Sequence, residues 1–453
     1  MQFQDRTNTC ACGVSLPVQA SHSGVCCMDV HVVYNQHAGH HKAKKLLDAV
    51  VRPRLEAWCH AHHETRCMLH FHETDAQTGA IGTGRALTQQ AIDRASVYVV
   101  LGGDGTVHEL LQGMYLERRV FLEDHGVSLV IVPVGTGNAL YHSHFGPDIS
   151  PSRDPTWRLR SLEAFLRSAP AGRASCALTV MRANPGSRLA CVVVSHALHT
   201  AILRDSEALR SNHPGLERFQ MAAEKNATVW CDAVLTLLPQ EQAPVTVYDP
   251  TTRIFRAVNE KQVNQSEMRM AEEDATLSYE CMPDGRVRLR GPFIYMNAMT
   301  VDRLEPTFVP APFASVYAPE PLRRPSDAMD VVVMRPMQRR PTGSRCVSRD
   351  EEAVTYASDV LYPALFQGMY KQGRHVDMTY TDHHEAHHVH EGNRPFQVAH
   401  SRPVVEYFRA AGYEWTPLPG DEQARSMCVD GTVVNVDHAN VQVLRSAHVY
   451  LWG

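Results

Sequence analysis

A glycine-rich turn follows an apolar run near the start of this 453-residue chain. Residues 97–101 (Val-Tyr-Val-Val-Leu) predict a buried strand, because a β-branched run that ends in glycines is typical of one. Residues 102–106 (Gly-Gly-Asp-Gly-Thr) form the turn, and helical spacing follows over residues 108–114. A strand, a tight turn and a helix present backbone N–H groups to an anion, usually a phosphate. The central carboxylate of the turn, Asp104, indicates a proton acceptor or a metal ligand beside that phosphate.

A second turn of this kind follows the next apolar run. Residues 128–132 predict another buried strand, and residues 133–140 (Pro-Val-Gly-Thr-Gly-Asn-Ala-Leu) place two glycines, a hydroxyl and an amide where a helix would begin. A first strand, over residues 30–34, leads into Asn35. In an open parallel sheet, adjacent loops of this sort meet in one crevice at the carboxyl ends of the strands. Together, the three turns predict one anion-binding crevice.

These motifs resemble the diacylglycerol kinase catalytic-domain superfamily of lipid kinases, and within it the sphingosine and ceramide kinase branch. The first turn with Glu109 and Gly113, and residues 133–138, carry the resemblance. Residues 203–210 (Leu-Arg-Asp-Ser-Glu-Ala-Leu-Arg) are similar to an Asp-Ser-Glu-x-x-Arg region of that branch. Residues 429–431 (Val-Asp-Gly) are similar to another of its elements. The likeness runs in patches from about residue 30 to the C-terminus and is strongest in the first 140 residues.

The resemblance implies an ATP-dependent lipid kinase that uses Mg²⁺. It assigns Asp104 as the base that accepts the proton of a primary lipid hydroxyl as that hydroxyl attacks the γ-phosphate of ATP. The implied acceptor is a sphingoid long-chain base such as sphingosine or sphinganine, with Asp205 as a substrate contact. Mg²⁺ is expected to bind through the nucleotide phosphates, and no protein ligand is assigned to it. The implied nucleotide-binding residues are Asn35, Thr74, Gly102, Gly103, Gly105, Thr106, Glu109, Gly135, Thr136, Gly137, Asn138, Glu207, Arg210, Arg218, Asp430 and Gly431.

Several positions depart from the family pattern, among them His196 and His199, which stand where the family has small or aromatic residues. Gln36 stands where the family has proline, and Thr432 stands where it usually has glutamate. Ala201 and Leu203 occupy the positions at which an aspartate of sphingosine kinases is expected to bind the ammonium head group. Two alternatives to a sphingoid-base kinase therefore stay open: a ceramide or diacylglycerol kinase, and a catalytically inactive relative that binds lipid or nucleotide. A nicotinamide-dinucleotide kinase shares the Gly-Gly-Asp-Gly turn, but the lipid-kinase-like C-terminal half argues against it.

The alternation of strands and helices predicts a doubly wound α/β nucleotide-binding domain over residues 28–173, with residues 157–168 as its last amphipathic helix. The resemblance gives it an ATP-NAD kinase or diacylglycerol kinase-like fold. A β-rich sandwich, the expected lipid-binding domain, is predicted over residues 174–453. Its expected strands are 176–181, 189–195, 227–238, 287–289 and 293–299. A polar extension is expected over residues 1–27, and insertions near 240–274, 335–350 and 381–395.

Composition restricts the partners. The formal net charge of −5 leaves no basic footprint for nucleic acid. The sequence has no run of 18 or more apolar residues, so no transmembrane helix is predicted. The polar stretch 1–24 has no signal-peptide core. A cytoplasmic location is therefore expected, with peripheral contact at the membrane that holds the lipid substrate. The sequence leaves the oligomeric state open.

Three further groups of residues stand out in the sequence: scattered cysteines, clustered histidines and an apolar segment near the C-terminal third. The 12 scattered cysteines favour reduced thiols, and the N-terminal group of Cys10, Cys12, Cys26 and Cys27 fits no zinc module. A histidine group has metal-ligand spacing on a helix, although a solvated polar insertion is the preferred interpretation: His383, His384, His387, His388 and His390. Residues 358–370 carry apolar side chains at helical spacing that form either the wall of an acyl-chain cleft or plain core: Val360, Leu361, Leu365, Phe366 and Met369.

Overall fold

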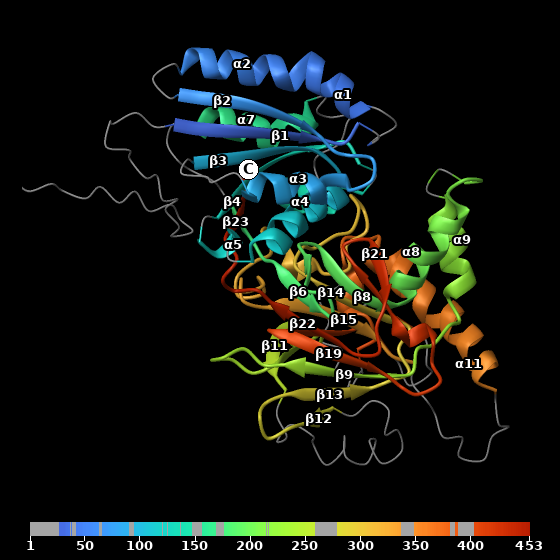
Figure 1. The fold of residues 1–453 in the computed structure, drawn as a ribbon. Helices are drawn as coiled ribbons and strands as arrows, with labels where there is room; N and C mark the ends of the chain where they lie inside the picture. The colour runs from blue at the N-terminus through green and yellow to red at the C-terminus, as the bar shows by residue number, and fades with distance from the viewer. Residues whose placement is uncertain are drawn as a thin grey trace, which may run out of the picture. The chain divides into compact units, whose positions relative to one another are not determined.

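The computed structural model divides into two compact units (Figure 1). Unit 1 takes in residues 1–180 and 445–453, and unit 2 takes in residues 181–444. The residues that the structure describes are 27–36, 38, 42–62, 66–89, 95–119, 121–124, 126–135, 137–146, 156–168, 176–213, 215, 217–258, 279–336, 348–380, 386–387 and 403–453. Each unit has its own sheets and its own hydrophobic core, and each is described by itself.

Unit 1 is built on a sheet with the strand order β2-β1-β3-β4-β23-β5. Four neighbouring parallel strands form most of it: β1 (Cys27–Tyr34), β2 (Arg66–Glu73), β3 (Ala95–Gly102) and β4 (Val127–Pro133). All of β4 is buried, as expected of a strand inside a parallel sheet. The strands predicted at 30–34, 97–101 and 128–132 are confirmed, each with slightly wider bounds.

Two short strands complete this sheet. β23 (Val449–Leu451) pairs in parallel with β4, and β5 (Cys176–Leu178) pairs antiparallel with β23. The sequence analysis assigned all of residues 174–453 to the second domain, so this assignment is wrong for both strands. The edge of β4 needs backbone partners, and the far end of the chain supplies them.

Helices connect the strands of unit 1. One hydrophobic cluster joins Val30 of β1 to Leu55 of α2 and Phe165 of α7. The helix predicted over residues 157–168 is confirmed as η2 followed by α7. The bounds are α1 (Lys42–Leu46), η1 (Leu47–Val51), α2 (Arg52–Ala61), α3 (Gly79–Gln89), α4 (Asp104–Glu117), α5 (Phe121–Asp124), α6 (Ala139–Phe145), η2 (Trp157–Leu159) and α7 (Arg160–Ser168).

Glycines let α3 and α4 pack backbone against backbone. A Cβ atom on Gly113 would lie 2.2 Å from the carbonyl oxygen of Ile81, and one on Gly84 would lie 2.3 Å from that of Leu110. Both distances are shorter than a side chain tolerates. The close approach of the two helices accounts for Gly113, one of the residues that carry the family resemblance.

Cys59 of α2 and Cys67 of β2 form a disulfide, with their Cα atoms 5.7 Å apart. The expectation of reduced thiols is wrong for this pair. The helix packs on the strand that follows it, and this packing brings together two thiols eight positions apart in the sequence. The described cysteines outside this disulfide that stay as thiols are Cys176, Cys191, Cys231, Cys281 and Cys428.

Unit 2 is β-rich, as predicted, and contains two large antiparallel sheets. One has the order β11-β10-β18-β15-β14-β8-β20-β21, and the other has the order β12-β13-β9-β19-β22-β6-β7. A single hydrophobic cluster takes buried residues from both, including Phe293, Phe408 and Trp415. The bounds are β6 (Met181–Asn184), β7 (Arg188–Ala190), β8 (Val193–Ala197), β9 (Ala233–Leu238), β10 (Thr246–Asp249), β11 (Ile254–Ala257), β12 (Glu280–Cys281), β13 (Val287–Arg290), β14 (Tyr295–Met299), β15 (Met329–Met334), β18 (Glu406–Ala410), β19 (Gly412–Pro417), β20 (Ser426–Val429), β21 (Thr432–Asn435) and β22 (Ala439–Val443).

Several predicted strands of unit 2 have different bounds. The run 189–195 breaks into β7 and β8, and the run 176–181 divides between β5 and β6. The run 227–238 is a strand only from Ala233, because α9 occupies the residues up to Asn226. The expected insertion at 240–274 begins with the hairpin of β10 and β11, and its residues 259–274 lie outside the described part.

Helical segments complete unit 2, and a short ribbon pairs β16 (Thr379–Tyr380) with β17 (Ala386–His387). The predicted helical segment 358–370 is confirmed within a continuous run that starts at α11. The bounds are α8 (Leu198–Leu209), α9 (Glu217–Asn226), η6 (Pro312–Ala314), α11 (Arg349–Tyr356), η7 (Ala357–Leu361), η8 (Pro363–Met369), η9 (Arg374–Asp377) and η10 (Gln423–Arg425). None of the helices in the described ranges has both the length and the apolar character needed to cross a bilayer.

Candidate active site

The carboxyl ends of four neighbouring parallel strands bring the predicted loop residues of unit 1 to one edge of the sheet. Asn35 follows β1 and donates its backbone N–H to Leu101 of β3, at 3.3 Å. Thr74 follows β2 and donates to Tyr34 of β1, at 3.0 Å. The sheet order reverses between β1 and β3. This is the place at which open α/β sheets bind their ligands.

The two glycine turns touch each other directly. A Cβ atom on Gly135 would lie 2.6 Å from the Cα atom of Gly103, and one on Gly103 would lie 3.2 Å from the Cα atom of Gly135. A Cβ atom on Gly102 would lie 2.4 Å from the hydroxyl oxygen of Thr106. Glycine is therefore required at positions 102 and 135, because backbone or a buried side chain fills the space, and position 103 leaves little room for a side chain.

Gly105 has the opposite environment. Apart from its chain neighbours and its own helix backbone, no atom of the described residues lies within 4 Å of the position that its Cβ would occupy, although the residue sits in the first turn of α4. The first N–H groups of a helix have no carbonyl partner within it, and they carry a partial positive charge. This open position at the start of a 14-residue helix is where a phosphate would approach the backbone.

The second turn is held by the side chain of Asn138. This residue has a left-handed backbone, with a φ of 52°, which asparagine tolerates better than most residues. Its Oδ1 accepts the N–H of Gly135 at 3.1 Å, and its Nδ2 donates to the carbonyl oxygen of Gly135 at 2.8 Å. The amide thus closes the turn onto itself. Thr136 lies inside this turn but outside the described residues.

Asp104 links the two turns. Its Oδ2 accepts the backbone N–H of Ala139 at 2.8 Å, and its Oδ1 accepts that of Leu140 at 3.0 Å. Both donors belong to the first turn of α6, so the carboxylate lies at the positive end of that helix. The predicted base is therefore held in position by two backbone N–H groups of the second turn.

Glu109 has a structural contact. Its Oε2 accepts the backbone N–H of Ala80 at 2.9 Å, at the start of α3. Gly79, with a φ of +57°, brings the chain close to the same carboxylate. The contact ties α4 to α3, and a role for Glu109 in nucleotide binding stays a prediction. Thr106 is buried, and its N–H donates to the carbonyl oxygen of Gly103.

The remaining predicted site residues lie in unit 2, on α8 and α9 or in the turn between β20 and β21. Glu207 and Arg210 form an exposed ion pair at 2.7 Å. Arg218 is buried, with its guanidinium 4.6 Å from the centre of the Phe219 ring. The structure gives these residues packing contacts within unit 2. Their role in nucleotide binding stays a prediction.

Asp205 joins α8 to α9. Its carboxylate receives Lys225 Nζ at 2.9 Å, Asn226 Nδ2 at 3.1 Å and Arg204 Nε at 2.8 Å. Burial acts to raise the pKa of Asp205, but the hydrogen bonds from Lys225, Arg204 and Asn226 outweigh it and hold the pKa well below its ordinary value. Three donors therefore already surround the carboxylate that the sequence analysis assigned to substrate.

Asp430 is also used within unit 2. The residue has a left-handed backbone, with a φ of 43°, and its carboxylate accepts three backbone N–H groups. The donors are Cys191 at 2.7 Å, Val192 at 3.1 Å and Val193 at 2.8 Å. These contacts stabilise the break between β7 and β8 that the sequence did not predict. A nucleotide contact of Asp430 or Gly431 stays a prediction.

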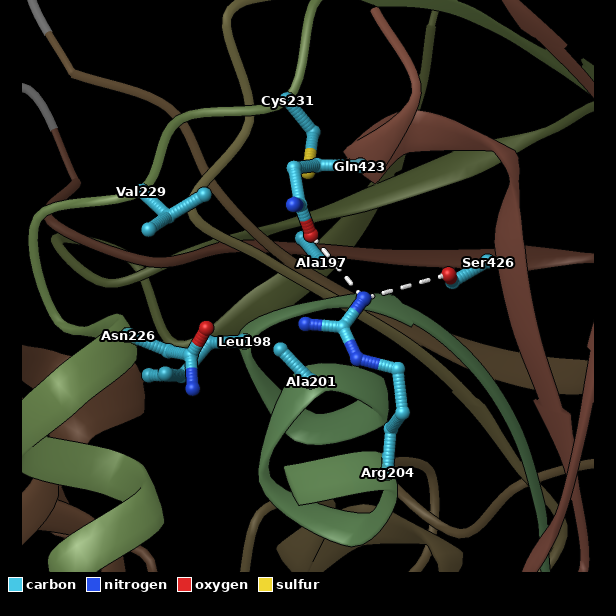
Figure 2. Close-up of a pocket in the computed structure, with 9 residues that line it drawn as sticks. All are labelled: Ala197, Leu198, Ala201, Arg204, Asn226, Val229, Cys231, Gln423 and Ser426. Atoms are coloured by element: carbon cyan, nitrogen blue, oxygen red, sulfur yellow. Dashed lines mark hydrogen bonds between the residues drawn. The ribbon is translucent and has the colours of Figure 1, made fainter.

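A small pocket lies beside α8 (Figure 2). The Arg204 guanidinium points into it, and its Nη1 donates to Gln423 Oε1 at 2.9 Å and to Ser426 Oγ at 3.4 Å. Burial, the largest cause, raises the pKa of the Cys231 thiol to about 12, so this lining group is neutral at pH 7. The pocket has room for about one water molecule. Its lining residues are Ala197, Leu198, Ala201, Arg204, Asn226, Val229, Cys231, Gln423 and Ser426.

Sequence reasoning did not assign Arg204 to this pocket, although the arginine stands next to Asp205 in the segment that carries the resemblance. The N-terminal group Cys10, Cys12 and Cys26 and most of the histidine group lie outside the described residues. Within the described ranges, no group of three or more His, Cys, Asp or Glu side chains is arranged to hold a metal ion.

Comparison with known proteins identifies the domain around Asp104. Residues 29–155 match the family described as the diacylglycerol kinase catalytic domain. A solved diacylglycerol kinase from Bacillus anthracis str. Sterne is 13% identical, with 93% of this chain and 96% of that chain covered and a TM-score of 0.46. A putative diacylglycerol kinase from the same strain is 14% identical, with 93% and 95% covered and a TM-score of 0.48. No curated protein matches the chain.

Two glycine substitutions are expected to have opposite effects. Gly135→Ala should lower the free energy of unfolding by about 1–3 kcal/mol, because its Cβ meets the backbone of Gly103. Gly105→Ala should leave stability unchanged or raise it by up to about 1 kcal/mol, yet weaken ATP binding, because its Cβ enters the open phosphate position. Thermal unfolding and ATP titration of both variants check this. Unchanged ATP affinity in Gly105→Ala would place the phosphates elsewhere.

Proposed function

We propose that this chain, which residues 29–155 mark as a lipid kinase of the diacylglycerol kinase catalytic-domain type, transfers the γ-phosphate of ATP to the primary hydroxyl of a lipid. The observation that carries the proposal is the position of Asp104, a fixed carboxylate at the junction of two glycine turns. An acidic group beside a phosphate cradle repels the nucleotide unless it takes part in the reaction. Its task here is to accept the proton of the attacking hydroxyl.

The reaction is a single displacement. The lipid hydroxyl oxygen forms a bond to the γ-phosphorus, the bond from that phosphorus to the bridging oxygen breaks, and ADP leaves. The hydroxyl proton passes to Asp104. In this proposal the turn residues hold the phosphates and the ribose side of the nucleotide: Asn35, Thr74, Gly102, Gly103, Gly105, Thr106, Gly135, Thr136, Gly137 and Asn138. Mg²⁺, bound to the nucleotide phosphates, would neutralise their charge.

The sequence-based candidate for the acceptor is a sphingoid long-chain base, proposed from the resemblance of residues 203–210. Such a lipid carries an ammonium group, which a carboxylate would normally pair. Ala201 and Leu203 carry no polar atom in their side chains, and Asp205 is already surrounded by Lys225, Arg204 and Asn226. The described residues near this segment therefore offer no vacant carboxylate for the head group.

A neutral lipid is the second candidate, and the pocket beside α8 favours it. Ala201 lines this pocket together with the guanidinium of Arg204 and the side chains of Asn226 and Ser426. Guanidinium, amide and hydroxyl donors suit an ester or amide carbonyl, and the positive charge of the guanidinium repels an ammonium group. We therefore place a diacylglycerol or a ceramide ahead of a sphingoid base as acceptor.

The test is a transfer assay with labelled ATP and Mg²⁺ on the purified chain. Sphinganine, ceramide and diacylglycerol are presented in detergent mixed micelles, and NAD is tested in parallel. Product from a neutral lipid supports the proposed acceptor, and preferential phosphorylation of sphinganine would overturn it. Phosphorylated NAD would instead indicate a dinucleotide kinase. Bound ATP without any product would indicate a catalytically inactive relative.

Arg204→Gln tests the pocket within the same assay. Loss of one charge-assisted hydrogen bond should raise the KM for the preferred neutral lipid about tenfold or more, while the KM for ATP stays unchanged. Arg253→Gln is the matched control, since Arg253 pairs with Asp377 elsewhere in unit 2. An unchanged lipid KM in Arg204→Gln would remove the pocket from substrate recognition.

A further inference from the structure

The helical run from α11 through η8 has one face inside unit 2 and one face in solvent (lower right in Figure 1, orange). Val360, Leu361 and Met369 are buried, so these three residues of the predicted amphipathic segment are core, as one interpretation of the sequence held. Phe366 belongs to the same segment, yet 56% of its surface is exposed. The core does not account for this residue.

Aromatic side chains follow one another along the exposed face at intervals of four residues. The ring centres of Tyr362 and Phe366 are 6.0 Å apart, and those of Phe366 and Tyr370 are 6.1 Å apart. Phe308 extends the row, with its ring centre 4.8 Å from that of Tyr370. We call these four residues the aromatic ladder. The rings of Phe366 and Tyr370 are stacked, and the other two pairs are tilted. Phe366 and Tyr370 are exposed to solvent, which marks an interaction surface.

Two cations stand at the C-terminal end of the ladder. Lys371 and Arg374 are both exposed, and neither forms an ion pair with any other residue in the described ranges. The left-handed Gly373, with a φ of +77°, turns the chain between them and packs against Pro312. The acidic first turn of α11 lies at the other, N-terminal end of the run. Because a helix rises by about 1.5 Å per residue, that turn is well separated from the two cations. The ladder end of the run therefore combines aromatic rings with positive charge.

Two carboxylates also lie near the ladder. Glu305 accepts the hydroxyl of Tyr370 at 2.7 Å, and the same hydrogen bond, after burial, raises the pKa of Tyr370 above its ordinary value. The phenol thus stays protonated and uses its hydroxyl to hold Glu305. Asp359 accepts the hydroxyl of Ser358 at 2.6 Å, on the N-terminal side of Tyr362. Both carboxylates have a donor partner, whereas the two cations have none among the described residues.

We propose that the aromatic ladder, with Lys371 and Arg374, is a docking surface for a lipid bilayer that contains anionic lipids. Aromatic rings with a polar tip favour the interface between water and hydrocarbon, and unpaired cations beside them attract anionic head groups. The proposed lipid kinase activity supplies the reason to meet a bilayer, so the inference rests on the proposed function to that extent. A second copy of the chain is the competing occupant.

Vesicle co-sedimentation of the full chain tests the surface. Vesicles of phosphatidylcholine alone are compared with vesicles that also contain phosphatidylserine. Phe366→Asp should weaken binding to both about tenfold or more, because it removes one large apolar side chain from the contact. Lys371→Glu with Arg374→Glu should weaken binding to the phosphatidylserine vesicles only, and added salt should produce the same loss in the unchanged chain.

Ile254→Asp is the matched control, since Ile254 is a comparably exposed apolar residue of β11, with 46% of its surface in solvent. It should bind vesicles like the unchanged chain. Equal binding by Phe366→Asp, or an equal loss in Ile254→Asp, would overturn the docking surface. A dimer that Phe366→Asp dissociates, with vesicle binding intact, would assign the ladder to a second copy and overturn it as well.

Failure of the proposed function is distinguishable from failure of this inference. Vesicle binding needs no catalysis, so Asp104→Asn should sediment with vesicles like the unchanged chain. Phe366→Asp should keep its kinase activity on lipid in detergent micelles, because the enzyme does not need to bind a bilayer to reach that substrate. Ladder-dependent vesicle binding without phosphorylation of any lipid would support the docking surface and contradict the proposed function alone.

Discussion

Replacing Asp104 by asparagine is expected to lower kcat for lipid phosphorylation by a factor of about 10²–10⁴, the usual contribution of a positioned general base. The amide cannot take the hydroxyl proton. It keeps one oxygen for the N–H groups of Ala139 and Leu140, which now hold both carboxylate oxygens, so the cost in stability should be about 1 kcal/mol. The measurement is steady-state transfer in mixed micelles, with thermal unfolding and ATP titration of the same preparation.

Asp249→Asn is the matched control for this prediction. Asp249 also accepts two backbone N–H groups, from Thr251 at 2.8 Å and Thr252 at 3.4 Å, but it lies in the β10–β11 hairpin of unit 2 and outside the proposed site. Its variant should carry a similar structural cost and normal turnover. Turnover of Asp104→Asn within a few-fold of the unchanged chain, with ATP still bound, would exclude Asp104 as the base.

Local backbone chemistry made the two glycine turns of unit 1 predictable. The turn at residues 102–106 comes directly after a buried strand. The close approach of Gly103 and Gly135 leaves little room for a side chain at either position. Such steric requirements restrict the residue types at consecutive positions, so they are visible in the sequence. The contact between Asp104 and the start of α6 is not visible in a local sequence pattern, because the partners of Asp104 are 35 and 36 positions away in the chain. The sequence indicated the type of chemistry, and the structure supplied the geometry.

The same difference explains the errors in unit 2. The run 189–195 is apolar up to Val194, so the pattern predicted one strand, whereas the structure interrupts it where Asp430 receives three N–H groups. Asp430 belongs to a turn that is distant in the sequence, and no local pattern predicts such a contact. The pocket beside α8 is similar, since Gln423 and Ser426 are far from Arg204 in the chain.

The aromatic ladder shows the limit of periodicity in another way. Residues 358–370 are apolar at helical spacing, and this pattern describes core and surface positions alike. The spacing of four residues that joins Tyr362, Phe366 and Tyr370 was visible in the sequence. Only the packing of the other face, with Val360 and Leu361 buried, showed which side the rings occupy.

Asp330→Ala is expected to cause the largest loss of stability, about 3–5 kcal/mol. Asp330 of β15 is completely buried and faces Arg409 of β18, its register partner, with Oδ1 2.9 Å from Nε. Tyr407 donates its hydroxyl to the other oxygen at 2.6 Å. Burial, and then the nearby carboxylate, raise the pKa of Tyr407 well above its ordinary value, so the phenol remains a donor. Removing the carboxylate leaves a buried cation without its counter-ion, and this is the costly way to break a buried pair.

The comparison that isolates this effect is the double variant Asp330→Leu with Arg409→Met. Removing both charges together should recover most of the loss, because the desolvation cost of the arginine disappears along with its partner. Glu320→Ala, which breaks the exposed pair between Glu320 and Arg323, should cost at most about 1 kcal/mol. Urea unfolding, followed by near-ultraviolet circular dichroism, measures the free energy of unfolding of the unchanged chain and of these three variants. A loss in Asp330→Ala no larger than that in Glu320→Ala would mean that solvent reaches Arg409 once its partner is gone, and that the sheet holding β15 and β18 does not depend on the pair.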